Sequence, residues 1–492
     1  MKKMISIALS SVIMMLCGAI GCTAGEAGGQ GDMEKFLPAT KYVKAERWES
    51  VPCNTLSFEI IGGKDVMPIG AWWAPYDTAG NIMNGQQLPN YLGEDRGVED
   101  RYFKLAKDAG INVFTVSPSS VPDNLDANIT LLEKCEKYGI GAFVYDTRFN
   151  QKSRELLENM NQYLNEYDFI NYESAIGVHV LDEPTANKFD DLAEIYKAYD
   201  KLGIDDKYLY TNMLPSLYGL RGGNYAGAGN AEIDYETYLR EYLDKVSTKF
   251  LSYDYYCIES ANTGSVNYPD YFKNLEIVRR LAKEYEIPFW AFALAGGQHE
   301  ETAYETKPVF PDEAELLWNV NTSLAYGAKS IQYFCFIQPQ QFTMTPNGGR
   351  DFTRNGMIGA MGNLNQWYYY AQKANQQIQA IDHILMNSEN LGIIRGGEVA
   401  EGCINGDVVL NNFRELQSVQ GGHYIIGCFD YYGATALYIV NNSVTEKENL
   451  TLNFSDKFGY DIYQRAQKFS AAGKSVKLAL EAGEGVLVTL RY

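Results

Sequence analysis

The chain has 492 residues and a mass of 55.3 kDa, and its 42 Lys and Arg against 62 Asp and Glu give a formal net charge of −20. Its 46% hydrophobic and 21% charged residues are typical of globular proteins and argue against a disordered chain, a collagen or a multi-span membrane protein. A chain this acidic repels phosphate backbones, so we expect no nucleic-acid partner. Tyr, at 37 residues, outnumbers Phe, at 22, and its flat face with a polar tip suits neutral ligands such as sugars.

The first residues have the pattern of an export signal. A basic start at Met1–Lys3 precedes an apolar run, Ile5–Gly21, that is too short for a stable membrane span. The run ends Gly18-Ala19-Ile20-Gly21-Cys22, which resembles the lipobox of bacterial lipoproteins, with Ala in place of the usual Leu three residues before the Cys. This resemblance implies removal of residues 1–21 and lipidation of Cys22, whereas the alternative is cleavage without a lipid. We therefore expect an exported protein whose only membrane contact is this lipid, at the periplasmic or cell-surface face of the outer membrane.

Residues 22–40 are small and Gly-rich in their first half, as in a flexible tether. Residues 41–66 follow, with Leu56–Ile61 before Gly62-Gly63, and we expect them to form a strand hairpin that caps the floor of the next domain.

From there to residue 387 short β-rich runs alternate with segments of helical period. The eight expected strands are Pro68–Trp73, Ile111–Ser117, Ile140–Asp146, Ala175–Leu181, Tyr208–Met213, Phe250–Ile258, Ile287–Leu294 and Ser330–Ile337. The eight expected helices are Val98–Ala109, Asn124–Tyr138, Ser153–Tyr167, Asp190–Leu202, Tyr235–Val246, Tyr271–Tyr285, Asp312–Tyr326 and Asn363–Leu385. Four helices end at a Gly that can take the left-handed stop conformation: Gly110, Gly139, Gly203 and Gly327. This alternation predicts an α/β domain over residues 41–387, a closed (β/α)₈ TIM barrel rather than an open doubly wound sheet.

Residues 388–492 have a different pattern. Alternating runs separated by Gly, Asn and Asp turns occur at Tyr424–Phe429, Ala436–Asn441, Leu450–Phe454, Val476–Leu480 and Gly485–Leu490. They show no helical period, so we expect a C-terminal all-β sandwich domain.

Metal, nucleotide and redox motifs are absent from the sequence. None of the eight Cys falls in a CxxC pair, there are only four His and no HxxxH, and no GxxxxGK[ST] or GxSxG motif occurs. We expect no metal site and no cofactor, and we expect the six Cys after the signal region to be buried free thiols rather than disulfides.

Active sites of such barrels lie at the carboxyl ends of the strands, and the fourth strand is the informative one. It reads Ile176-Gly-Val-His-Val-Leu-Asp-Glu-Pro184, so Asp182 and Glu183 end an otherwise apolar strand. Burial of such charges costs several kcal/mol unless they are paired or used. Alternatively, Asp182 caps the next helix and Glu183 is an ordinary acid on the rim.

In this strand and in its barrel-plus-sandwich plan, the chain resembles the retaining glycoside hydrolases of clan A, which include the family 42 β-galactosidases and family 5 glycanases. The resemblance spans roughly residues 60–490 and implies that Glu183 is the general acid/base, with Asp182 where the clan usually has Asn. A partly desolvated Glu has a raised pKa and can protonate a departing glycosidic oxygen, and this mechanism needs no cofactor.

The clan's nucleophile, a Glu at the end of strand seven, has no counterpart in Ile287-Pro-Phe-Trp-Ala-Phe-Ala-Leu-Ala-Gly-Gly297. Three substitutes stay open. Asp254 at the end of strand six could hold a water or attack directly. Glu300 or Glu301 could reach in from the following loop. Alternatively, Asp182 could orient a substrate acetamido group beside Glu183, an arrangement similar to that of hexosaminidases.

The expected substrate-binding residues are aromatic or polar groups near strand ends. Trp72, Trp73, Tyr256 and Trp290 could stack on sugar rings, and Asn212 and His299 could bind sugar hydroxyls. The alternative is that the aromatic residues belong to the barrel core.

Two functions therefore stay open for a carbohydrate partner. The first is a glycoside hydrolase that acts through Glu183, and the second is a catalytically degenerate barrel lipoprotein that binds glycans. The missing strand-seven Glu keeps the second open, and a lyase or an esterase has no motif in its favour.

Overall fold

A computed structural model of the chain describes residues 52–75, 99–116, 125–260, 268–301, 306–309, 311–337, 356–359, 362–396 and 413–492, with short pieces of backbone at 82–83, 86–87 and 265–266. The expected signal peptide (1–21), lipidation site Cys22 and tether (22–40) lie outside these residues, so they stay predictions.

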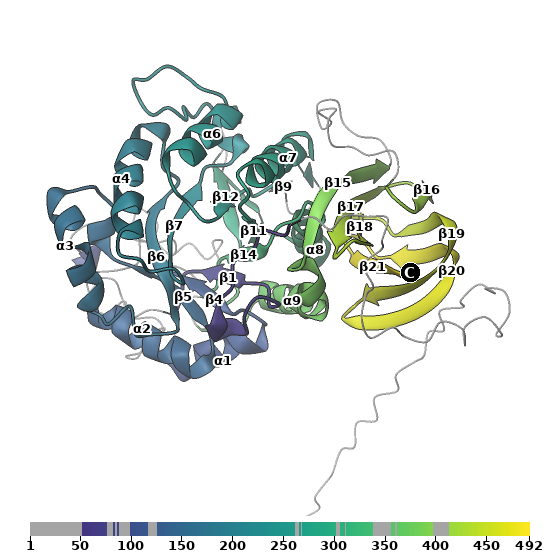
Figure 1. The fold of residues 1–492 in the computed structure, drawn as a ribbon, viewed down its shortest axis with the longest axis horizontal. Coiled ribbons are helices and arrows are strands. Elements are labelled where there is room, and N and C mark those ends of the chain that lie inside the picture. Colours follow the sequence, from purple (N-terminus) through teal and green to yellow (C-terminus); the bar gives the residue numbers. More distant parts are fainter. Residues whose placement is uncertain are drawn as a thin grey trace, which may run out of the picture.

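The first domain is a closed barrel of eight parallel strands wrapped by helices (Figure 1). In order around the ring the strands are β1 (Ile69–Trp72), β4 (Val113–Thr115), β5 (Gly141–Tyr145), β6 (Ala175–Asp182), β7 (Tyr208–Met213), β8 (Leu251–Tyr253), β11 (Phe289–Leu294) and β14 (Ser330–Phe334). Because β1 pairs with both β14 and β4, no strand edge is left open. The eight expected strands and the predicted barrel are confirmed.

The helices of the barrel also lie where the periodicity predicts them. They are α1 (Asp100–Asp108), α2 (Leu125–Tyr138), α3 (Arg154–Asn165), α4 (Phe189–Asp200), α6 (Tyr235–Lys245), α7 (Tyr268–Glu284), α8 (Glu313–Ala325) and α9 (Gln366–Leu385). The four expected stop glycines all have positive φ: Gly110 (79°), Gly139 (62°), Gly203 (68°) and Gly327 (97°). Shorter elements lie in the connections: the helix α5 (Ser216–Leu220) and the hairpins β2–β3 (Ile82–Met83, Gln86–Gln87), β9–β10 (Ile258–Ser260, Ser265–Val266) and β12–β13 (Gln298–Glu301, Thr306–Val309).

The prediction of an N-terminal strand hairpin is wrong. Within residues 52–66 the backbone forms no strand, and Glu59–Ile61 is instead a turn of 3₁₀ helix. Gly62 and Gly63, with φ of 119° and 81°, turn the chain away from an extended path. The segment does close the barrel floor, because the Phe58 ring lies 5.7 Å from that of Tyr208, where β7 begins.

The second domain is an antiparallel sheet that confirms the predicted sandwich. Its strands are β15 (Ser388–Gly396), β16 (Leu416–Gln420), β17 (Tyr424–Tyr431), β18 (Ala434–Asn441), β19 (Glu448–Gln464), β20 (Gln467–Leu480) and β21 (Gly485–Arg491). The register of β19 against β20 shifts between Asn453 and Phe458. As a result, the first half of β19 pairs with β16 and the second half with β21, and the sheet folds over an apolar core.

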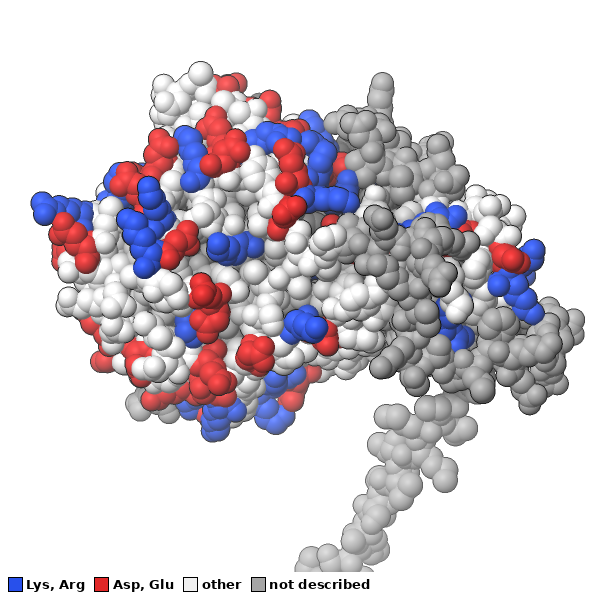
Figure 2. Space-filling view, viewed as in Figure 1, with Lys and Arg blue, Asp and Glu red and all other residues white. Residues whose placement is uncertain are grey.

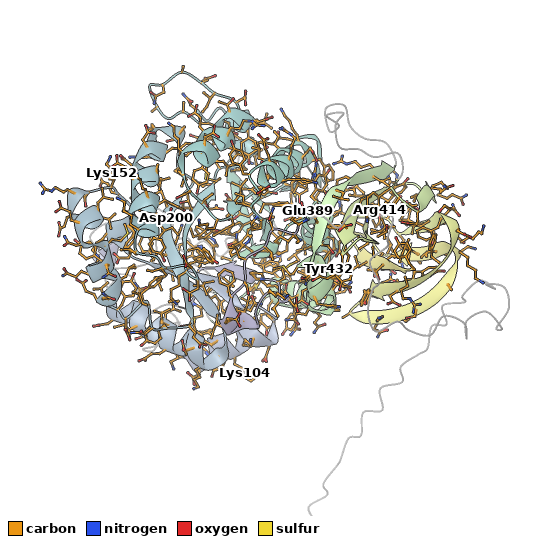
Figure 3. The ribbon with its side chains drawn as sticks, in the orientation of Figure 1. Lys104, Lys152, Asp200, Glu389, Arg414 and Tyr432 are labelled. Carbon is orange, nitrogen blue, oxygen red and sulfur yellow. The ribbon has the colours of Figure 1, made fainter. Side chains whose placement is uncertain are left out.

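The two domains share part of their cores, with α8 between the barrel strands and the sheet (Figure 1). Trp318 of α8 donates from Nε1 to Asn442 at 3.0 Å, and Asn321 donates to the carbonyl of Gly483 at 2.8 Å. Farther into the sheet, Arg414 (Figure 3) forms a buried ion pair with Asp430 at 2.6 Å.

The surface charges are mixed. On the face in Figure 2, acidic and basic side chains intersperse over the barrel helices. Exposed ion pairs join some of these helices, and Lys152, for example, pairs with Asp191 and Glu194 at 3.1 and 2.8 Å. Exposed pairs of this kind contribute only about 0–1 kcal/mol each, so the apolar cores stabilise the fold. In the part of the chain that the structure describes, no helix combines the length and apolar character that crossing a membrane requires.

The role of Phe58 in closing the barrel floor can be tested by substitution. We expect Phe58→Ala to lower the free energy of unfolding by about 3–5 kcal/mol, because Phe58 is 3% exposed and its loss leaves a cavity. Phe469→Ala is the matched control, since that ring is 51% exposed, and it should cost less than about 1 kcal/mol. Urea unfolding of both variants measures the difference, and equal losses would contradict the assigned role of Phe58.

Candidate active site

Two carboxylates end β6 at the mouth of the barrel. Asp182 is the last residue of the strand, and Glu183 turns the chain out of it with a left-handed φ of 48°. The Glu183 N–H donates to the carbonyl of Asn212 at 2.8 Å, which holds this turn against β7. A non-Gly residue in this conformation costs about 1–2 kcal/mol, and such strain concentrates at functional sites. The Glu183 side chain is exposed at this end of the barrel.

A third carboxylate joins them from β8, on the other side of β7. Asp254 directly follows β8 and is 9% exposed. Its carboxyl group lies close enough to that of Glu183 for the two groups to shift each other's pKa. The amide of Asn212, on β7, donates to Asp254 Oδ1 at 2.9 Å and to Asp182 Oδ1 at 3.3 Å. The barrel thus brings together all three carboxylates that the sequence singled out as catalytic, with Asn212 between two of them.

A buried chain of hydrogen bonds fixes the orientation of Asn212. Ser252 Oγ donates to Asn212 Oδ1 at 3.0 Å, so the amide nitrogen must face the carboxylates. Ser252 in turn accepts from Gln332 Nε2 at 2.9 Å, and Gln332 Oε1 accepts from the Tyr210 hydroxyl at 3.1 Å. These four side chains are at most 2% exposed, and each donor in the chain has an acceptor. The carboxylates therefore sit on a preorganised support.

The pKa of each carboxylate is raised. Burial raises the pKa of Asp182 to about 7, with a further increase from the charge of Glu183 and an opposing effect of the Asn212 hydrogen bond. Burial also raises the pKa of Glu183, while the interaction with Asp254 lowers it. Asp254 has its pKa raised well above the ordinary value by burial and then by the charges of Glu183 and Asp182. Near neutral pH the cluster therefore retains protons that separate carboxyl groups would lose.

Tyr256 lies close to this cluster. It is half-buried, and burial followed by the charges of Asp254 and Glu183 raises the pKa of its hydroxyl. Its ring centroid is 5.7 Å from that of Phe334 at the end of β14. Tyr256 is thus placed where a ligand at the carboxylates could meet it, and its role in binding stays a prediction.

The three tryptophans expected to stack on a sugar are core residues instead. Trp72, Trp73 and Trp290 are 4%, 5% and 1% exposed. Trp290 packs on Phe250 at 4.3 Å between ring centroids, and Trp72 lies edge-on to His179 at 5.0 Å. Rings that point into a barrel fill its interior layers, which leaves no face free for a ligand.

Other expected residues are only partly described. The backbone of His299, Glu300 and Glu301 forms β12, one strand of a hairpin after β11, and their side chains lie outside the described residues. The expectation of buried free thiols is confirmed for Cys135, Cys257, Cys335 and Cys428. Cys53 is free but only half-buried, and Cys403 lies outside the described residues.

Sequence reasoning missed the support beneath the carboxylates. Ser252, Gln332 and Tyr210 carry polar groups inside strands that are otherwise apolar, and that contrast is the signal that could have identified them. His179 lies in the same interior, where Nδ1 contacts the carbonyl of Val116 at 3.0 Å and burial lowers its pKa to about 4. It is therefore neutral at physiological pH.

The arrangement can give and take protons at the mouth of the barrel. A solvent-facing carboxyl group with a raised pKa can act as a general acid, and a buried neighbour can control its charge. Among the side chains the structure describes, no group of three or more His, Cys, Asp or Glu is placed to hold a metal ion.

The chain is similar in fold to several solved structures. No protein-family model and no curated protein matches the chain. Among solved structures, it is similar to a GH27 β-L-arabinopyranosidase from Geobacillus stearothermophilus, with 10% identity, a TM-score of 0.47 and coverage of 87% of this chain and 97% of that one. It is also similar to an endo-β-1,4-mannanase from Thermotoga petrophila, with 11% identity, a TM-score of 0.39 and coverage of 86% and 98%. A β-galactosidase from Marinomonas ef1 matches with 9% identity, a TM-score of 0.40 and coverage of 65% of this chain and 62% of that one. Similarity at this level concerns the fold alone.

The raised pKa of Asp182 makes stability depend on pH. Below about pH 4 the carboxyl group is protonated in both folded and unfolded chains, and as the pH rises to 7 the unfolded chain ionises first and the folded state loses stability. Asp182→Asn lacks this titration and keeps the acceptor for Asn212. We expect its stability relative to the unsubstituted protein to rise by up to about 3 kcal/mol between pH 4 and pH 7, then to level off. Urea unfolding across this range measures it, and parallel curves for the two proteins would contradict the prediction.

Proposed function

We propose that the protein is a glycoside hydrolase that cleaves a glycosidic bond in an oligo- or polysaccharide, with Glu183 as the general acid/base. The supporting observation is that Glu183 is an exposed residue in a strained turn at the barrel mouth, beside Asp182 and the buried Asp254, which share the amide of Asn212. A structural acid on the rim needs neither the strain nor these neighbouring carboxyl groups.

The roles of the three carboxyl groups follow from their exposure. Glu183 meets the leaving-group oxygen and protonates it as the bond to the sugar breaks. Asp254 is 9% exposed, and its Oδ1 accepts from the Asn212 amide at 2.9 Å. This burial disfavours Asp254 as the group that attacks the sugar or activates water on its opposite face.

The position of Asp182 favours one substrate class as a specific second candidate. Asp182 stands beside Glu183 and is held by the Asn212 amide, as a group that orients a substrate acetamido function must be. In that case the acetamido oxygen attacks the sugar carbon, and no second carboxylate is needed across the mouth. A 2-acetamido sugar is therefore the first substrate to try.

We expect Glu183→Gln to lower kcat at least about a hundredfold, because Gln cannot transfer a proton. The assay is a panel of aryl glycosides and oligosaccharides with and without a 2-acetamido group, followed by release of the aglycone or of reducing ends. Glu232→Gln is the matched control, since Glu232 is an exposed acid in the connection that follows β7.

Unchanged turnover in Glu183→Gln would exclude this role for Glu183. Binding of sugars without turnover in either protein would favour the glycan-binding alternative.

We further propose that the protein is exported and held at the outer membrane by a lipid on Cys22. Support comes from the lipobox-like sequence and the Gly-rich segment that follows it. We expect Cys22→Ser, expressed in a Gram-negative bacterium, to move the protein from the detergent-extracted membrane fraction to the soluble exported fraction. Partition into the membrane fraction by both proteins would contradict a lipid at this residue.

A further inference from the structure

The amide group of Asn212 is engaged by the protein on both of its ends. Its Nδ2 donates to Asp254 Oδ1 at 2.9 Å and to Asp182 Oδ1 at 3.3 Å, and its Oδ1 accepts from Ser252 Oγ at 3.0 Å. An amide nitrogen carries two hydrogens, so each carboxyl group can take one. Asn212 is also only 2% exposed. A sugar hydroxyl would have to displace an aspartate to accept from this amide, which argues against Asn212 as a direct sugar ligand.

The register of the barrel places Asn212 between its partners. On β7 it lies opposite Asp182 of β6 and opposite Ser252 of β8, and Asp254 follows two residues after Ser252. Asp182 and Asp254 therefore come from strands that are not neighbours in the ring, yet they share one donor. When ionised, the two carboxyl groups repel each other, and the shared amide is the group that holds them on one side of β7.

The direction of this amide depends on Ser252. Gln332 Nε2 donates to Ser252 Oγ at 2.9 Å, which leaves the hydrogen of Ser252 for Asn212 Oδ1. A rotated amide would lose this bond and turn its oxygen toward two carboxyl groups. Gly70, opposite Gln332 on β1, leaves room for the Gln332 side chain, because a Cβ at this position would lie 3.1 Å from Gln332 Cγ.

This polar chain is buried among aromatic rings. Tyr210, whose hydroxyl contacts both Ser252 and Gln332, packs against three of them. These rings belong to Phe143, Phe250 and Trp290. Apolar side chains would fill such a place without any need for hydrogen-bond partners, whereas a buried network that is satisfied selects one arrangement of its members. The gain from this chain is therefore a fixed orientation of Asn212.

We propose that Asn212 is a positioning residue that acts through Asp182 and Asp254: its amide holds the two carboxyl groups in the relative orientation used in turnover, and Ser252 holds the amide. This role rests on the proposed hydrolase function, whereas the bonds from Asn212 to the ionised carboxyl groups can be tested without a substrate.

The kinetic constants of Asn212→Ala separate positioning from sugar binding. Misplaced carboxyl groups slow the chemical step, so we expect kcat to fall about ten- to a hundredfold while KM changes less than about threefold. The assay uses a substrate whose turnover Glu183→Gln abolishes. An unchanged kcat would overturn the proposal, and a raised KM beside it would identify Asn212 as a sugar ligand instead.

Substitution of Ser252 tests the same role without a change in Asn212 or in either carboxyl group. Ser252→Ala removes the bond that orients the amide, and we expect kcat to fall at least about threefold. Ser252→Thr keeps the hydroxyl group and should recover most of the activity. A wild-type kcat in Ser252→Ala, or no recovery in Ser252→Thr, would overturn the role of Ser252 in holding the amide.

The substrate-free test is the pH dependence of stability. Burial raises the pKa of Asp182 and of Asp254, and the hydrogen bond from Asn212 opposes this increase in both. Asn212→Ala lacks this opposing effect, so its folded-state pKa values lie higher still. From about pH 4 to pH 7 both proteins lose stability together; above pH 7, where Asp182 is ionised in the wild type, the variant continues to lose it. We expect the Tm deficit of the variant to grow by at least about 2 °C from pH 6 to pH 9.

Other ionisable groups face the two aspartates in both proteins. They are Glu183 after β6, Tyr210 on β7, Tyr253 and Tyr256 around β8, and Tyr235 on α6. Burial raises the pKa of each of these tyrosines, so their hydroxyl groups stay neutral over this range.

Asn375→Ala is the matched control for stability. Asn375 is fully buried, and its amide bonds only neutral groups, the Tyr333 hydroxyl at 2.7 Å and the carbonyl of Ala109 at 2.8 Å. Its Tm deficit should be the same at pH 6 and pH 9. An equally constant deficit in Asn212→Ala would overturn the proposal. If Asn212→Ala does not fold, the same comparison with Ser252→Ala decides.

Failure of the proposed function is distinguishable from failure of this role. If Glu183→Gln leaves turnover intact, the proposed function fails, and the Tm measurements still decide whether Asn212 supports the ionised carboxyl groups. If turnover depends on Glu183 but kcat is unchanged in Asn212→Ala, only the role of Asn212 is wrong.

Discussion

Closure of the barrel is the constraint on which the rest of the structure depends. β1 pairs with β14 on one side and β4 on the other, so every strand of the ring is hydrogen-bonded on both edges and all eight carboxyl ends meet at one mouth. β6, β7 and β8 are neighbours in that ring. Asp182 and Asp254 therefore reach the same amide of Asn212 from positions 30 and 42 residues away in sequence.

The cluster of carboxyl groups is costly, and the barrel interior lowers that cost in two ways. The chain from Tyr210 through Gln332 and Ser252 supplies an amide donor whose direction is fixed. The raised pKa values of Asp182, Glu183 and Asp254 keep protons on the cluster near neutral pH, which lowers the negative charge of a site where each unpaired charge costs several kcal/mol. Strongly shifted pKa values and a strained residue lower the stability of the folded protein. Their presence at one site therefore indicates a functional role for that site.

The surrounding packing supplies the stability that such a site needs. Rings from several strands fill the barrel below the cluster, and Phe58 closes the floor. On the side, α8 binds the sheet through Trp318 and Asn321, and residues of both domains form one apolar cluster. The sandwich therefore packs directly on the barrel.

Local sequence patterns determined the elements of this protein. Strand runs buried on both faces, helical periods and stop glycines such as Gly110 act over a few residues, so the barrel and the sandwich were predictable. The same logic placed Asp182, Glu183, Asn212 and Asp254 at strand ends, hence at one mouth.

Only the tertiary structure decided which side chains face each other. Trp72 and Trp290 fill the barrel rather than the binding site, because strand alternation does not say which aromatic rings the interior layers take. The approach of Asp182 and Asp254 to one amide, and the hydrogen bonds of Ser252 that orient Asn212, depend on the stagger of β6, β7 and β8. That stagger follows from closure of the whole ring, a long-range property that no local stretch of sequence carries.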